Sequence, residues 1–294
     1  MDFNTEFQKK IKLTDSWLEE YLNRKCDAPP LILEAMCYSV FAGGKRVRPA
    51  LMIGSYEMFS DKTEYIKPFA CAVEMIHTYS LIHDDLPAMD NSDLRRSKPT
   101  NHKVFGEANA VLAGDALLNY AFEIMTGNEQ KADEKTVLKT IARIAKYSGI
   151  CGMIGGQVID IASENKKIDI QTLKTLQEKK TGALIAAAVC GGASAAGADD
   201  KDICRLEKYS YLLGLAFQIK DDILDETSSS KELGKPVGND EKNHKNTYVS
   251  LCGFEKAKEL LQQYTSEAKE ILVSFGEKAE FLLCMTDYLL NRKK

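Results

Sequence analysis

The residues most able to do chemistry form an acidic cluster at positions 84–93. Asp84, Asp85, Asp90 and Asp93 follow directly on the apolar run 75–82. Aspartates withdrawn from water repel each other, so a fold that keeps them together needs a shared cation. Oxygen ligands select hard cations, and Mg²⁺ is the usual one where phosphate is also bound. The alternative is a solvated acidic turn, since charge clusters usually lie at the surface.

A second acidic cluster, Asp221, Asp222 and Asp225, follows the apolar segment 214–217. In a helix, Asp221 and Asp225 are four residues apart and share one face. The C-terminal end of a helix favours cations over carboxylates, so helix stability does not explain three aspartates there. The two clusters, each ending a buried helix, together predict a metal-binding pair.

Basic residues must balance these acids, and their number indicates phosphate binding. Each one alone is typical of a solvated surface charge. Together they are suited to phosphate, because Mg²⁺ binds some phosphate oxygens and Lys and Arg bind the rest. The candidates are Lys45, Arg46, Arg48, Arg95, Arg96, Lys179, Lys180, Lys235 and Lys245.

Motifs for other chemistries do not fit. The sequence has no GxxxxGK[ST] motif, which disfavours a nucleotide phosphate loop. The four histidines, at positions 77, 83, 102 and 244, lie in or beside the charged segments but lack zinc-ligand spacing. No basic block is present, so nucleic acid is not an expected partner.

The composition is that of a globular protein, with 294 residues, 44% hydrophobic and 28% charged residues, and a net charge of −4. The N-terminus has no signal pattern, and the longest uncharged run, 181–198, is mostly Ala and Gly. That run predicts a packed internal helix rather than a membrane span. Eight cysteines without a CxxC pair are typical of reduced, buried thiols in the cytoplasm.

Helical periodicity dominates, so we expect one all-α domain spanning residues 1–294. An amphipathic first helix is expected to stop at Pro29-Pro30, and segments 93–105 and 227–246 are expected to be loops, the second of them functional or mobile. Further helices are predicted at about 31–41, 50–59, 68–82, 108–125, 137–147, 173–196, 203–225, 255–273 and 278–290.

Five segments together resemble the short-chain trans-prenyl diphosphate synthases, and among them the bacterial farnesyl diphosphate synthases. Segments 84–90, with Arg95-Arg96 and 98–100, and 218–225 are similar to the two aspartate-rich motifs of this family. The other three matches are 43–49, 155–157 and 180–182. The resemblance covers nearly the whole chain.

The resemblance implies a bundle of roughly ten helices around a central cavity, working as a homodimer without a membrane span. It implies Mg²⁺-dependent, head-to-tail condensation of isopentenyl diphosphate with dimethylallyl and then geranyl diphosphate, which gives farnesyl diphosphate and releases diphosphate. Three Mg²⁺ ions are implied, with Asp84 and Asp90 holding two and Asp221 the third.

The resemblance also assigns the two substrates. It implies that Arg95, Lys180, Lys235 and Lys245 grip the allylic diphosphate, with Thr181 and Gln218 beside it. It implies that Lys45, Arg48, His77 and Arg96 hold isopentenyl diphosphate. The residues implied to be catalytic are Asp84, Asp90, Arg95, Lys180, Asp221 and Lys235.

The residues just before Asp84 predict the length of the prenyl product. Tyr79 and Ser80 lie five and four residues before it, and a Tyr there resembles a floor that stops growth at fifteen carbons. The alternative is that Tyr79 is only a core aromatic residue. A geranylgeranyl diphosphate synthase, a terpene cyclase and a silent partner subunit are the other functions in question, and two intact acidic motifs disfavour the last two.

Two departures from the family pattern lie beside the first motif. Asn91 and Ser92 replace part of a longer acidic run, and Ser97 stands where Gly is common. Asp84 and Asp90 are also too far apart to share one face of a straight helix. We therefore expect a turn at Pro87 that brings them back toward the same ions.

Overall fold

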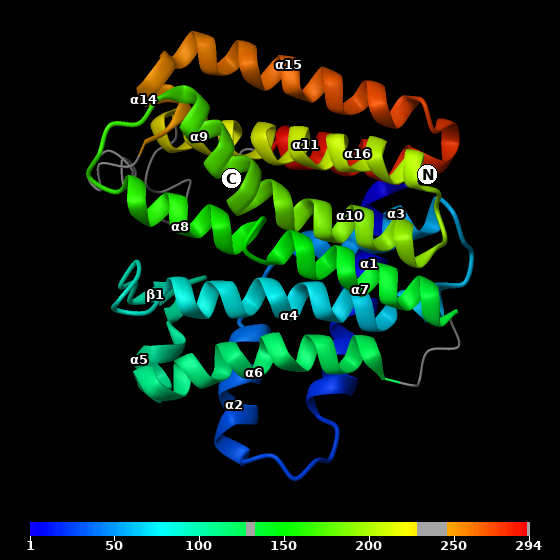
Figure 1. The fold of residues 1–294 in the computed structure, drawn as a ribbon, viewed down its shortest axis with the longest axis vertical. Helices are drawn as coiled ribbons and strands as arrows, with labels where there is room; N and C mark the ends of the chain where they lie inside the picture. The colour runs from blue at the N-terminus through cyan, green and yellow to red at the C-terminus, as the bar shows by residue number, and fades with distance from the viewer. Residues whose placement is uncertain (128–132, 228–245, 293–294) are drawn as a thin grey trace. The chain divides into compact units, whose positions relative to one another are not determined.

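The structure, a computed structural model, describes residues 1–127, 133–227 and 246–292 (Figure 1). The expected all-α class is confirmed, since the described strands are only two residues long each. The backbone divides into an N-terminal unit, residues 2–142 and 191–197, and a C-terminal unit, residue 1 with 143–190 and the described part of 198–294. No described helix is long and apolar enough to cross a membrane.

The N-terminal unit is built around α4 (Lys67–Asp84), which is buried on nearly all sides. α4 lies along α6 (Glu107–Thr126), as Figure 1 shows. The other elements of this unit are α1 (Phe3–Leu22), α2 (Pro30–Val40), α3 (Val47–Glu57), the 3₁₀ helix η1 (Thr63–Ile66), β1 (Leu94–Arg95), β2 (Lys98–Pro99), α5 (Asn101–Phe105) and the first residues of α7 (Glu134–Ser148).

A glycine on α6 fixes the end of α4 that carries the first acidic cluster. A Cβ at Gly114 would lie 2.1 Å from Nε2 of His83, so the ring occupies the space that a side chain at position 114 would need. Nε2 of His83 is 3.1 Å from the carbonyl oxygen of Val111. The last turn of α4 is therefore held against α6 just before Asp84.

The C-terminal unit is built around α11 (Asp200–Thr227), which packs against α15 (Phe254–Val273) (Figure 1). The described residues of 173–196, expected as one helix, contain a π-helical turn that separates two α-helices. The remaining elements are the end of α7, α8 (Met153–Ser163), α9 (Ile170–Gln177), the π turn η2 (Glu178–Gly182), α14 (Tyr248–Cys252), the 3₁₀ helix η3 (Gly276–Ala279), α16 (Glu280–Leu290) and the larger part of α10 (Ala183–Ala195), whose last turn belongs to the N-terminal unit.

Three expectations about local structure were wrong. α1 ends at Leu22, well before the prolines, and Pro30 is instead the first residue of α2, where its missing N–H costs nothing. Segment 93–105 holds a hairpin and the short helix α5 rather than only a loop. Of the eight free cysteines only Cys71 and Cys190 are buried, while the other six are partly or fully exposed.

Ser97, which stands where Gly is common in the family, lies in the turn of the hairpin formed by β1 and β2. Arg96 and Ser97 connect β1 to β2 with φ values of +53° and +62°, so both lie in the left-handed region. A two-residue turn with both residues left-handed is of type I′, which favours Asn and Gly. Ser97 therefore sits at a position where a Cβ strains the backbone.

We expect Ser97→Gly to stabilise the protein by roughly 0.5–1 kcal/mol, because it removes this strain while adding some unfolded-state entropy. Thermal unfolding measures the change. Ser92→Gly is the matched control, since Ser92 has an ordinary negative φ and glycine there brings no relief. A lower melting temperature for Ser97→Gly than for the unsubstituted protein contradicts the interpretation.

Candidate active site

The first acidic motif is a tight turn at the end of α4. The N–H of Asp85 donates to the carbonyl of Leu81 at 3.1 Å, which closes the helix. The N–H of Asp90 then donates to the carbonyl of Asp84 at 2.9 Å. The chain therefore folds back after Pro87, as expected, and brings the backbones of Asp84 and Asp90 together. Asp84 is half-buried and Asp90 is exposed.

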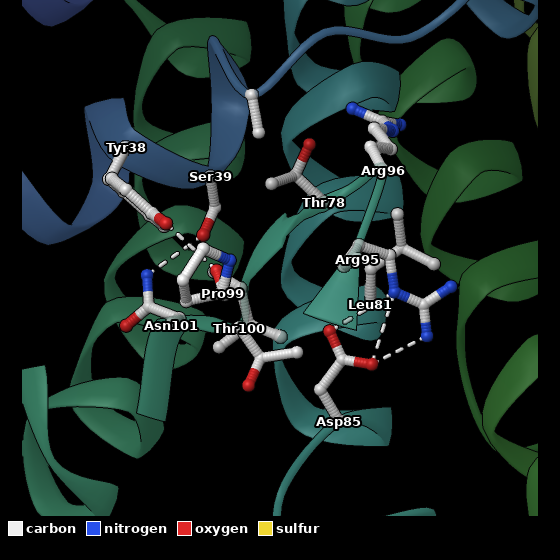
Figure 2. A pocket seen from close by; sticks show the side chains of 12 residues that line it. Tyr38, Ser39, Thr78, Leu81, Asp85, Arg95, Arg96, Pro99, Thr100 and Asn101 are labelled. Atoms are coloured by element: carbon white, nitrogen blue, oxygen red, sulfur yellow. Dashed lines mark hydrogen bonds and ion pairs between the residues drawn. The ribbon is translucent and has the colours of Figure 1, made fainter. Parts of the chain in front are cut away.

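Asp85, the second aspartate of the first motif, is neutralised by an ion pair with Arg95. Nε of Arg95 is 3.1 Å from both carboxylate oxygens of Asp85, and Nη2 is 2.5 Å from Oδ1 (Figure 2). Burial opposes the charge of Arg95, but the hydrogen bonds and charge of Asp85 outweigh it, so the pKa of Arg95 is raised. Asp85 therefore acts as a counter-ion for Arg95 rather than as a vacant ligand.

The adjacent residue, Arg96, contacts the basic turn 43–48 instead of the acidic motif. Figure 2 shows the guanidinium of Arg96 directed away from Asp85, while that of Arg95 meets it. Nη1 of Arg96 donates to the carbonyl of Gly43, in the basic turn 43–48. Gly44 has φ +127°, a backbone conformation that favours glycine, and the Arg96 guanidinium lies 2.8 Å from where its Cβ would be.

A cationic cluster of Arg48, His77 and Arg96 lies at this basic turn. Nε of Arg48 and Nδ1 of His77 are both buried and have no hydrogen-bond partner in the described chain. Burial, with the positive charge of Arg96, lowers the pKa of Arg48 to about 10, although Glu74 opposes this. Burial and the nearby guanidiniums of Arg48 and Arg96 hold the pKa of His77 well below its ordinary value. His77 is therefore neutral at pH 7, beside charged Arg48, while Lys45 is exposed.

The two chain-length candidates lie within α4. Tyr79 is buried, its ring meets that of His83 edge to face at 5.7 Å, and its hydroxyl has no partner among the described residues. Burial and the charge of Asp84 raise the pKa of Tyr79 to about 12. Ser80 donates from Oγ to the carbonyl of His77 at 2.9 Å, so its hydroxyl is already used by the helix.

Lys180 lies in the π turn of the C-terminal unit. A Cβ at Gly156 of α8 would lie 2.2 Å from the backbone nitrogen of Lys180, so this glycine allows α8 to approach the turn. Nζ of Lys180 is 2.5 Å from Oδ2 of Asp160, also on α8. Thr181 donates to Oε1 of Gln218 at 3.1 Å, so these two residues are neighbours.

The second acidic motif has three aspartates in three different settings. Asp221 forms an ion pair with Arg292 near the C-terminus. Asp222 accepts a 2.7 Å hydrogen bond from the N–H of Tyr248, so it caps the start of α14. Oδ1 of Asp225 is buried without a described partner. That orphaned oxygen fits a cation ligand.

Each acidic motif has donors that fit Mg²⁺, although the described residues alone do not enclose an ion. Asp84, Asp90 and Asp221 offer the oxygen ligands that Mg²⁺ prefers. Within the described ranges, no three acids, histidines or cysteines converge to form a closed metal site. Mg²⁺ commonly binds one or two carboxylates and completes its shell with water and phosphate oxygens. Lys235 and Lys245 lie outside the described residues.

Three charged partners in these sites were missed from the sequence. Asp160 pairs with Lys180, and Arg292 pairs with Asp221, and nothing local to either residue indicates this. Glu74 pairs with Arg46 and is the one acid within the apolar stretch 68–82. A single carboxylate in a buried helix does signal a buried partner, so Glu74 could have been recognised.

Comparisons with known proteins show similarity to enzymes named for two different prenyl products. A geranylgeranyl diphosphate synthase of Cyanophora paradoxa is 45% identical over 278 residues, which is 94% of this chain and 93% of that protein. A farnesyl diphosphate synthase of Geobacillus stearothermophilus is also 45% identical, over 87% of this chain and 86% of that protein. Proteins named for the two products are thus equally similar to this chain.

A solved geranyltransferase of Helicobacter pylori, complexed with magnesium and isoprenyl diphosphate, has a TM-score of 0.85 and 32% identity. The match covers 99% of this chain and 97% of that one. The model of the polyprenyl synthetase family matches residues 29–274, which include both acidic motifs and the basic turn. The chain therefore belongs to the polyprenyl synthetase family and is a short-chain prenyltransferase.

Proposed function

We propose that the chain condenses isopentenyl diphosphate with dimethylallyl and then geranyl diphosphate, to give farnesyl diphosphate and release diphosphate. The observation that carries this is that two sites of opposite charge adjoin α4, the cationic one through Arg48 and Arg96 beside neutral His77. The cationic cluster lies at His77, and the acidic motif begins at Asp84, about 10 Å further along the helix. One site attracts an anion directly, and the other attracts an anion through a metal ion.

The acidic site is suited to the allylic diphosphate. Asp84 and Asp90 would hold two Mg²⁺ ions and Asp221 a third, as the magnesium of the Helicobacter pylori structure supports. Bound Mg²⁺ would neutralise the charge that develops on the departing diphosphate. Arg95, Lys180, Lys235 and Lys245 would grip the same diphosphate, with Thr181 and Gln218 beside them.

The basic site is suited to isopentenyl diphosphate. Lys45, Arg48, His77 and Arg96 would hold its diphosphate, since Nε–H of Arg48 is a donor that has no partner among the described residues. The C–O bond of the allylic substrate breaks, and the alkene of isopentenyl diphosphate attacks the resulting cation. The released diphosphate would accept the proton, so the proposed reaction needs no protein base.

We also propose that two copies of the chain form a homodimer in a reducing compartment such as the cytoplasm. Val111 and Leu112 present exposed apolar side chains on α6, which supports association through that helix. The eight free thiols support the compartment.

The relatives differ in the length of the product for which they are named. A geranylgeranyl diphosphate synthase is the second candidate, favoured by the Cyanophora paradoxa protein. Incubation with Mg²⁺, labelled isopentenyl diphosphate and dimethylallyl diphosphate, followed by chromatography, tests both. We expect a dominant fifteen-carbon product, and none without Mg²⁺. A dominant twenty-carbon product overturns the choice, and no consumption of isopentenyl diphosphate overturns the proposed function.

Replacing Tyr79 tests the proposed floor. We expect Tyr79→Ala to shift the main product from fifteen to twenty or more carbons, because the buried ring is removed from α4. The same chromatography measures the shift. Tyr79→Phe is the control, since it keeps the ring and loses only the unpartnered hydroxyl. An unchanged product profile for Tyr79→Ala contradicts a role for Tyr79 in chain length.

The buried, neutral His77 predicts a dependence of stability on pH. Its pKa is lower in the folded than in the unfolded chain, so below about pH 6.5 the unfolded chain binds an extra proton. The fold then loses up to about 1.4 kcal/mol per pH unit as the pH falls toward the folded pKa. We expect the melting temperature to fall less between pH 7.5 and 5.5 in His77→Gln than in the unsubstituted protein. Equal falls contradict the prediction.

A further inference from the structure

Arg46, counted among the phosphate-binding candidates, does not point toward a substrate. Only 4% of its side chain is exposed. Nη1 donates to Oε1 of Glu74, Nε to Oδ1 of Asp15, and Nη2 to the carbonyl of Val40, each at 2.8 Å. The guanidinium therefore joins α1, the end of α2 and α4, and three of its nitrogens are already used.

The backbone of Arg46 lies in an unfavourable conformation that this side chain holds. Arg46 precedes α3 with φ +47° and ψ +36°, in the left-handed region that disfavours residues with a Cβ. Gly43 and Gly44 before it also have positive φ values. The turn thus consists largely of left-handed residues, and the buried guanidinium of Arg46 anchors it to α4.

The anchored turn carries the cations of the basic site. Lys45 directly precedes Arg46, and Arg48 follows it in the first turn of α3. On α4, His77 lies three residues after Glu74 and so on a neighbouring part of the same face. Glu74 is 2% exposed and is the one described carboxylate whose charge favours both Arg48 and Arg96 in their charged forms.

We propose that Glu74, acting through Arg46, is a positioning residue for the isopentenyl diphosphate site. It fixes the basic turn so that Lys45 and Arg48 stand beside His77 before substrate arrives. Glu74 itself is placed away from the substrate, because its side chain is only 2% exposed and its Oε1 accepts from Arg46. The inference rests on the proposed function, which supplies the identity of the diphosphate.

A purely stabilising role is the alternative, and buried ion pairs provide a way to separate the two. Removal of one partner leaves a buried charge and destabilises a fold, whereas apolar residues of similar volume often replace both partners without loss of stability. The double variant Arg46→Met/Glu74→Leu should therefore fold but lose the anchor. If the pair only stabilises, this variant keeps normal substrate binding.

Steady-state kinetics with each substrate varied in turn test the proposal. For the double variant we expect the KM for isopentenyl diphosphate to rise roughly tenfold or more, and the KM for dimethylallyl diphosphate to change by less than about twofold. Lys10→Met is the control, since it breaks the ion pair between buried Lys10 and the exposed Glu57 elsewhere in the same unit. Its melting temperature should fall with both KM values unchanged.

A folded double variant with an unchanged KM for isopentenyl diphosphate overturns the proposal. So does an equal rise in both KM values. If the double variant does not fold, Glu74→Gln is measured at low temperature by the same criterion.

Failure of the proposed function gives a different result. If the unsubstituted protein does not consume isopentenyl diphosphate, calorimetry with inorganic diphosphate still measures the cationic cluster. Roughly tenfold weaker binding by the double variant then supports the positioning role, and equal binding overturns it.

Discussion

Repulsion between like charges is the constraint on which the charged parts of this protein depend. Each acidic motif and each basic segment concentrates one sign of charge where water is partly excluded. Ion pairs reduce this repulsion: Asp85 pairs with Arg95, Lys180 with Asp160, and Asp221 with Arg292. Nε of Arg48 and Nδ1 of His77 differ from these groups, because they are buried and have no hydrogen-bond partner among the described residues. The proposed diphosphate substrate would supply a counter-charge for that cluster.

Burial divides these ion pairs into two kinds. Lys180 and Asp160 are 26% and 28% exposed, and such accessible pairs contribute only about 0–1 kcal/mol, so substrate can displace them at little cost. Arg46 and Glu74 are almost fully buried, and loss of one partner from such a pair costs about 3–5 kcal/mol. The exposed pairs can therefore exchange partners during a catalytic cycle, while the buried pair remains as a fixed support.

The sequence predicts most of the fold and much of the site, because both follow from local patterns. Apolar periodicity locates α4 and α11, and the spacing of Asp84 and Asp90 predicts the turn at Pro87. Tertiary partners are harder to predict, since Arg292 and Asp221 are far apart in the chain and have no shared pattern. The prediction that the prolines at 29–30 end the first helix was wrong, because proline is found both after the end and at the beginning of helices. The left-handed backbone of Ser97 became visible only in the structure.

The partner exchange of Lys180 is the most direct test of this view of the site. A crystal structure with Mg²⁺, isopentenyl diphosphate and a non-reactive analogue of dimethylallyl diphosphate measures it. We expect Nζ of Lys180 to leave Asp160, from which it is now 2.5 Å, and to contact the analogue's diphosphate. A bound analogue with Lys180 still paired to Asp160 would contradict the role of Lys180 in holding the allylic substrate.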